Sequence, residues 1–149
     1  MGRIGIVNSR QTLWDMTCDL MPIDKPSILL IDDENDTLVT LKKGLEGKGF
    51  EVDAFDASPQ ALQQFKPYRY DVVITDIHMP ILNGFEVYKL IRKQDEKVRI
   101  FFMTAFEVIE QEVKLAFPNL PPKSFITKTI TIEKLVTLIE SPREVTQAR

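Results

Sequence analysis

The 149-residue sequence is poor in the residues that several protein classes require. It has one cysteine, Cys18, which excludes an internal disulfide and suits a reducing compartment. It has one histidine, His78, so a zinc site built from several Cys and His ligands is excluded. No apolar run approaches the roughly 18 residues of a membrane-spanning helix, and no signal peptide is recognisable. These absences favour a cytoplasmic protein that does not contact a membrane.

An excess of charge of one sign is also missing. The 19 Lys and Arg residues nearly balance the 22 Asp and Glu residues, which gives a formal net charge of -3. This balance argues against a basic nucleic-acid-binding surface and against an acidic disordered tail. Hydrophobic residues make up 44% of the chain, as expected for a globular protein with a buried core. We therefore expect one compact domain that does not bind nucleic acid directly.

Several short catalytic and phosphate-binding motifs are absent. There is no G-x-x-x-x-G-K-[ST] loop and no G-x-S-x-G nucleophile elbow. The cluster Gly44, Gly47 and Gly49 has the wrong spacing for a dinucleotide fingerprint and suits the end of a helix. P-loop, α/β-hydrolase and dinucleotide-binding functions are therefore disfavoured.

The distribution of apolar residues divides the chain into three parts. Residues 1–25 show no sustained periodicity and are interpreted as an amino-terminal extension or as upstream sequence, because Met21 offers an alternative start. Residues 26–140 carry a regular pattern and form the predicted domain. Residues 141–149 form a carboxyl-terminal tail that is too short for an effector domain.

Within residues 26–140, five short apolar strands alternate with five amphipathic helices. Strands are predicted at 27–31, 51–55, 71–75, 100–103 and 123–127, and helices at 35–45, 58–65, 84–93, 108–117 and 131–140. Ser58 and Thr131 are predicted to cap the helices that they begin. Such alternation requires crossover connections, which make the sheet parallel and cover both of its faces. The predicted fold is a doubly wound α/β three-layer sandwich.

Polar residues follow four of the predicted strands. Asp32 and Asp33 follow the first strand, Asp76 the third, Thr104 the fourth and Lys128 the fifth. In open α/β sheets the ligand crevice lies beyond these carboxyl ends. Taken singly, the two aspartates suit a helix cap, the threonine a turn and the lysine a solvated surface. Together, carboxylates at one edge favour a hard divalent ion such as Mg²⁺.

Four segments of the sequence resemble the receiver domain of two-component response regulators, of the chemotaxis-response-regulator type. The segments are Ile28–Glu34, Ile74–Glu86, Met103–Ala105 and Phe125–Lys128. They contain the D-D, D-x-x-M-P-x-x-x-G, T-A and K elements of that family in the right order. The resemblance covers about residues 26–140. It implies a flavodoxin-like fold and a phosphoprotein that works as a signalling switch, not as an enzyme.

The resemblance also implies a phosphoacceptor and a metal site. Asp76 matches the residue that receives a phosphoryl group from the phosphohistidine of a sensor histidine kinase. Asp33 and Asp32 match the acidic pair that holds Mg²⁺. Asp76 and the backbone carbonyl of His78 would complete the protein's share of the metal ligands.

Three further residues match the parts of the family that sense the phosphoryl group. Lys128 would place a positive charge on it, Thr104 would hydrogen-bond to it, and Phe125 matches the aromatic switch. Plain core packing is the alternative interpretation of Phe125. A downstream protein would bind the face formed by helix 108–117, strand 123–127 and helix 131–140. A phosphorylation-dependent dimer is a further expectation.

The sequence departs from the family pattern near the site. Thr129 follows Lys128 where the family usually has a proline after a cis peptide bond. Pro118, Pro121 and Pro122 make the approach to the fifth strand longer and stiffer. His78 and Phe106 are bulky at two positions that influence access of water to the acyl phosphate, so we expect slow self-dephosphorylation.

Two alternative functions remain. A haloacid-dehalogenase-type phosphatase also uses an aspartate nucleophile and Mg²⁺, but its D-x-D-x-[TV] signature is missing, because the run Asp33–Thr37 has the wrong spacing. A receiver-fold interaction module that is not phosphorylated is the second alternative. The complete set of aspartates, threonine and lysine argues against it.

Overall fold

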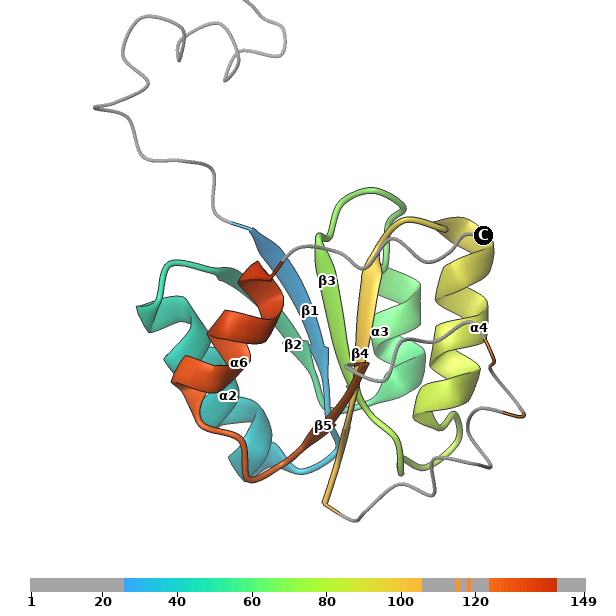
Figure 1. Cartoon of the computed structure of the whole chain (residues 1–149). Coiled ribbons are helices and arrows are strands. Elements are labelled where there is room, and N and C mark those ends of the chain that lie inside the picture. Colours follow the sequence, from blue (N-terminus) through green and yellow to red (C-terminus); the bar gives the residue numbers. More distant parts are fainter. Residues whose placement is uncertain (1–25, 106–114, 116–117, 119–123, 142–149) are drawn as a thin grey trace, which may run out of the picture.

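The computed structural model describes residues 26–105, 115, 118 and 124–141 of the chain (Figure 1). Its strands are β1 (Ser27–Ile31), β2 (Glu51–Phe55), β3 (Val72–Asp76), β4 (Arg99–Thr104) and β5 (Phe125–Thr127). Its helices are α2 (Asn35–Gly47), α3 (Ser58–Gln64), α4 (Gly84–Gln94) and α6 (Ile132–Glu140). The predicted helix at 108–117 lies outside the described residues except for position 115. The predicted extension at 1–25 and the tail beyond Ser141 lie outside them as well.

The five strands form one parallel sheet in the order β2-β1-β3-β4-β5. Helices α2 and α6 cover one face and α3 and α4 cover the other, as Figure 1 shows. This arrangement confirms the predicted doubly wound sandwich. The strand order reverses between β1 and β3, so a crevice is expected where these two strands end.

The unbroken apolar runs of the sequence become strands that are buried on both faces. In β1, Ile28 and Leu30 pack in the core under α2 and α6, whereas Leu29 and Ile31 pack in the core under α3 and α4. Successive side chains of a strand point to opposite faces, so one run supplies both cores. Each such side chain contributes about 1.5–3 kcal/mol by its burial. The central strands are thereby fixed in position relative to both helical layers.

Local signals in the sequence fix most of the helix ends. Thr131 caps α6 by accepting a hydrogen bond from the backbone N–H of Lys134, as predicted. Gly49 follows α2 with φ +98°, a conformation that glycine adopts at little cost. The prediction for α3 is wrong: Ala57 is the N-cap, because the hydroxyl of Ser58 donates to the carbonyl of Leu82 at 2.9 Å instead of capping its own helix.

Helix α4 begins directly beside β3. Its N-cap is Asn83, whose side chain accepts from the backbone N–H of Glu86 while the Glu86 carboxylate accepts from the Asn83 backbone. The N–H of Gly84 also donates to the carbonyl of Ile77 at 2.8 Å. These bonds tie the loop that follows Asp76 to the first turn of α4.

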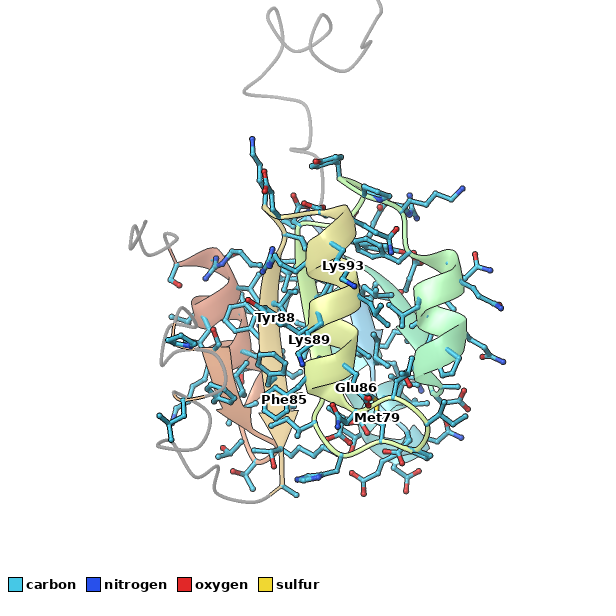
Figure 2. The ribbon with its side chains drawn as sticks, turned by 90° about the vertical axis from the view of Figure 1, so that its right-hand side faces the viewer. Met79, Phe85, Glu86, Tyr88, Lys89 and Lys93 are labelled. Carbon is cyan, nitrogen blue, oxygen red and sulfur yellow. The ribbon has the colours of Figure 1, made fainter. Side chains whose placement is uncertain are left out.

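Aromatic rings pack between α4 and the far edge of the sheet. Figure 2 shows Phe85 and Tyr88 on the side of α4 that lies toward β4. Their ring centroids lie 5.1 and 5.8 Å from that of Phe102. The ring of Phe102 is also stacked with that of Phe125, at a centroid distance of 5.3 Å. Within the described part of the chain, no helix is long and apolar enough to cross a membrane.

Candidate functional site

The polar residues predicted from the strand ends lie at one edge of the sheet. Asp32 directly follows β1, Asp76 ends β3, Thr104 ends β4 and Lys128 directly follows β5. Backbone hydrogen bonds continue the sheet pattern past the strands: the N–H of Lys128 donates to the carbonyl of Thr104 at 2.9 Å. The parallel topology therefore brings together residues from across the chain.

Three aspartates form the acidic part of the site. One carboxylate oxygen from each of Asp32, Asp33 and Asp76 lies within 4.8 Å of the others. Asp32 and Asp76 are buried, whereas Asp33 is exposed. The N–H of Glu34 donates to Asp32 Oδ1 at 2.9 Å, and the N–H of His78 donates to Asp76 Oδ1 at 3.3 Å. Backbone donors thus orient both buried carboxylates.

The ammonium group of Lys128 reaches into this acidic cluster. Its Nζ lies 3.1 Å from Asp32 Oδ2, 3.1 Å from Asp76 Oδ2 and 2.5 Å from Glu34 Oε1. The lysine side chain is only 12% exposed, so its pairs with the buried Asp32 and Asp76 are shielded from water. Lys128 is thus not the solvated surface lysine that its residue type alone suggests, and its role toward a phosphoryl group stays a prediction.

The crowding of charge shifts the acid–base behaviour of the site. Burial and the neighbouring charge of Asp76 raise the pKa of Asp32 from 3.8 to about 6, against the opposing hydrogen bond from Glu34. Burial and the Asp76 charge also raise the pKa of Asp33. Desolvation lowers the pKa of Lys128, but its hydrogen bonds to three carboxylates outweigh this effect and raise it overall. Negative charge exceeds the positive charge that this chain places here.

The site has the chemistry of a magnesium site. Asp32 Oδ2 is buried and has no hydrogen-bond partner, since its contact with Lys128 Nζ lacks hydrogen-bond geometry. A buried carboxylate oxygen without a partner is costly, and a cation would relieve that cost. Oxygen ligands from two or three carboxylates are those that Mg²⁺ prefers. The three aspartates therefore fit this ion.

The remaining predicted site residues differ in burial and in position. Thr104 is buried beside Lys128, at the end of β4. His78 is exposed and directly follows the loop residue Ile77, and the role of its carbonyl stays a prediction. Phe125 is half-buried against Phe102, which suits core packing and leaves the switch role a prediction. Phe106 lies outside the described residues.

The peptide bond after Lys128 is trans, like every other peptide bond among the described residues. Thr129 therefore does not reproduce the cis geometry that the family resemblance implies at this position. The hydroxyl of Thr129 lies 3.2 Å from that of Thr127, and the N–H of Ile130 donates to the carbonyl of Thr127. A short turn thus follows β5 with Lys128 held at its start.

Sequence reasoning missed two residues of the site. Glu34 contacts Lys128, and the only signal for it was a third acidic residue after the Asp32-Asp33 pair. Gly84 packs so closely against Asp76 that a Cβ atom would lie 2.5 Å from the Asp76 carbonyl oxygen. The G of the D-x-x-M-P-x-x-x-G pattern marked this position without explaining it.

The raised pKa of Asp32 predicts that acid stabilises the protein when EDTA is present. The folded protein holds this proton more tightly than the unfolded chain, so the stability contribution is greatest below pH 3.8 and is lost as pH rises through about 6. Between about pH 7.5 and pH 5 we expect a gain of roughly 1–2 kcal/mol. Urea midpoints at the two pH values measure it.

The control for this pH dependence is Asp32→Asn, which removes the titrating carboxyl and should flatten the difference. Added Mg²⁺ should also shrink it in the wild-type protein, because the ion binds the deprotonated carboxylates. If the stability of Asp32→Asn changed between the two pH values as much as that of the wild-type protein, another group would be responsible.

Comparison with known proteins places this geometry in a family. The family model described as response regulator receiver domain matches residues 28–140. The transcriptional regulatory protein PrrA of Mycobacterium leprae is 28% identical over 119 residues, which cover 80% of this chain and 50% of PrrA. The chain thus spans about half the length of this relative.

Solved structures show the same fold. The non-phosphorylated HemR receiver domain from Leptospira biflexa superimposes with a TM-score of 0.67 at 26% identity, over 81% of this chain and 99% of that one. A response regulator receiver domain protein from Clostridium thermocellum gives a TM-score of 0.65 at 29% identity, over 76% and 90%. The described site lies within residues 28–140, which the family model matches.

Proposed function

Because the chain belongs to the family of response regulator receiver domains, we propose that Asp76 is the residue on which it accepts a phosphoryl group. Members of this family are phosphorylated signalling switches and not enzymes in the ordinary sense. The observation that carries the assignment is the placement of Asp76: its buried carboxylate bonds to Lys128 and lies beside two further carboxylates. Asp32 shares these contacts, and what distinguishes Asp76 is that it begins the D-x-x-M-P-x-x-x-G pattern of the family.

The chemistry follows from the chain's own groups. A carboxylate oxygen of Asp76 attacks phosphorus as the P–N bond to the donor's histidine breaks, and the nitrogen keeps the bonding electron pair. An acyl phosphate remains on Asp76. The ammonium of Lys128, already 3.1 Å from Asp76 Oδ2, offsets the negative charge of the phosphoryl oxygens. The hydroxyl of Thr104, at the end of the neighbouring strand, donates a hydrogen bond to one of those oxygens.

Receiver domains use Mg²⁺ at an acidic pocket, and here Asp33, Asp32, Asp76 and the backbone carbonyl of His78 would hold it. When bound, the ion supplies positive charge against the phosphoryl oxygens and against the three aspartates. The unpartnered Asp32 Oδ2 supports this assignment. Asp33, which is exposed, gives the ion and the phosphodonor access to the site.

Receiver domains exchange signals with histidine kinases and downstream effectors, and we propose one of each for this chain. A sensor histidine kinase donates the phosphoryl group. The downstream protein binds the face formed by residues 108–117, 123–127 and 131–140, where a phosphorylation-dependent dimer would also form. Phe125 transmits the change by turning inward when Thr104 moves toward the phosphoryl group. The cytoplasmic location, the division at residues 25 and 140 and slow self-dephosphorylation stay predictions.

The test is intact-protein mass after incubation with acetyl phosphate and Mg²⁺. We expect one phosphate on the wild-type protein, labile at alkaline pH as an acyl phosphate is, and none when EDTA replaces Mg²⁺. Asp76→Asn should abolish the adduct. The matched control is Asp56→Asn, which removes an exposed carboxylate after β2 and should leave phosphate uptake unchanged.

The alternative functions give different outcomes in the same experiment. A receiver-fold module that is not phosphorylated would gain no phosphate under any condition. A haloacid-dehalogenase-type phosphatase would hydrolyse acetyl phosphate through many turnovers. A stable phosphate that persisted in Asp76→Asn would also overturn the proposal, since it would lie on another residue.

A further inference from the structure

The ammonium of Lys128 has no donor left for a phosphoryl oxygen. A lysine ammonium carries three N–H donors. In this structure its Nζ donates to three carboxylates, to Asp32 Oδ1 at 3.3 Å, Asp76 Oδ2 at 3.1 Å and Glu34 Oε1 at 2.5 Å. A phosphoryl group on Asp76 must therefore displace one of these partners before Lys128 can bind its oxygens.

Glu34 is the partner that can be released at the lowest cost. The Asp32 side chain is 1% exposed, so leaving its charge unpaired would be costly, and Asp76 is itself the group that carries the phosphate. The Glu34 side chain is 61% exposed, so water solvates its carboxylate once the lysine leaves. The three ion pairs thus differ in how easily each one breaks.

The backbone of Glu34 is held without help from its side chain. Its N–H donates to Asp32 Oδ1 at 2.9 Å, and its carbonyl accepts from the N–H of Leu38 at 3.0 Å. Glu34 is the N-cap of α2, but its side chain makes no capping hydrogen bond. Among the described residues the Glu34 carboxylate therefore pairs with Lys128 alone, and we expect its replacement to leave the start of α2 intact.

We propose that Glu34 is a positioning residue that holds Lys128 in the unphosphorylated state and competes with the phosphoryl group for its third N–H donor. The inference rests on the proposed function of Asp76. Glu34 thereby weakens the affinity of the site for a phosphoryl group and favours the unphosphorylated form.

The test measures affinity for fluoroberyllate, a stable mimic of the phosphoryl group, with saturating Mg²⁺ and by calorimetry. Glu34→Gln keeps the shape of the side chain and removes its charge, and we expect about two- to fivefold tighter binding. Glu34→Asp keeps the charge but is one methylene shorter, so it should also bind tighter than the wild-type protein. Higher salt should shrink both gains, because it screens the Glu34–Lys128 pair.

The matched control is Asp36→Asn. Asp36 lies in the first turn of α2 and is not among the three carboxylates that contact Lys128. Its removal changes the net charge near the site as Glu34→Gln does, and we expect unchanged affinity. Urea unfolding of each variant verifies that the fold is retained.

Equal gains in fluoroberyllate affinity in Glu34→Gln and Asp36→Asn would overturn the inference, because the loss of one negative charge near the site would then explain both. Unchanged or weaker binding by Glu34→Gln would overturn it too. Wild-type affinity in Glu34→Asp would show that charge alone acts and not contact with Lys128. In all three cases the proposed function would stand. A folded wild-type protein that bound no fluoroberyllate would instead overturn the proposed function, and this inference with it.

Discussion

Lys128→Met is expected to lower the free energy of unfolding by about 3–5 kcal/mol near pH 7.5 in EDTA. The substitution removes the ammonium that neutralises Asp32 and Asp76, whose side chains are 1% and 5% exposed. Two buried carboxylates would then face each other, with Asp33 close by. Methionine fills the volume of the lysine stem, so the loss reports charge and not a cavity. Urea or thermal unfolding measures it.

Mg²⁺ should restore part of the stability of Lys128→Met, because an ion that binds only the folded state stabilises it by mass action. Lowering the pH to about 5 should also restore stability, since protonation of a carboxylate removes the repulsion between the buried aspartates. The rate of phosphate uptake from acetyl phosphate should fall by about 100-fold or more, because the positive charge that offsets the phosphoryl oxygens is lost.

The matched control for this lysine is Lys42→Met. Lys42 pairs with Glu46 one helical turn away, and both side chains are exposed, at 40% and 44%. Such surface pairs contribute less than about 1 kcal/mol. If Lys128→Met lost no more stability than Lys42→Met, the ion pairs of the site would not hold the buried aspartates as described.

Gly84→Ala is expected to lower the free energy of unfolding by about 1–3 kcal/mol and to slow phosphate uptake by roughly 10- to 100-fold. The added Cβ would lie 2.5 Å from the carbonyl oxygen of Asp76 and 2.9 Å from Cα of Ile77. Both are backbone atoms and cannot rotate away as a side chain would. Either α4 or the end of β3 must move, and the second movement displaces Asp76.

The control for this glycine is Gly47→Ala in the last turn of α2. A Cβ there meets nothing within 4 Å, so the change should be neutral or stabilising by up to about 1 kcal/mol. Unfolding midpoints and acetyl phosphate kinetics on both variants separate the two effects. A Gly84→Ala protein with wild-type uptake would show that the start of α4 does not set the position of Asp76.

The Lys128 substitution acts on contacts between segments far apart in the sequence, whereas Gly84 contacts Asp76 across a single loop. Lys128 lies 96 residues from Asp32 and 52 from Asp76. The lysine and the glycine both hold the end of β3, one through charge and the other through close backbone packing. This dual support explains why we expect large effects on stability and on phosphate uptake from the same two changes.

Much of the fold was predictable because its signals are local. The runs at Ile28–Ile31 and Val72–Ile74 are too apolar for any position except a strand buried on both faces. Alternation with helices then required parallel crossovers, and parallel strands end at the same edge of the sheet. The grouping of Asp32, Asp76, Thr104 and Lys128 followed from that rule alone.

Sequence interpretation was wrong at Ser58 and open at Lys128, where a local signal competed with a tertiary one. Ser58 has the side chain of a helix cap, yet its hydroxyl bonds to Leu82, 24 residues away. Lys128 was open to interpretation as a solvated lysine until the burial of its side chain was known. In both cases the residue type allowed two partners, and only the packed structure selects one.

The sequence by itself determined the order of the elements, their burial and the residues that meet at the strand ends, because hydrophobic periodicity and parallel topology are properties of the chain. Only the tertiary structure decided which of the groups at the strand ends are in contact. It brings Glu34 to Lys128 and Gly84 against Asp76, and it leaves Asp32 Oδ2 buried without a hydrogen bond. Such contacts depend on distances of a few ångströms in the packed structure, and no pattern of residue types along the chain specifies them.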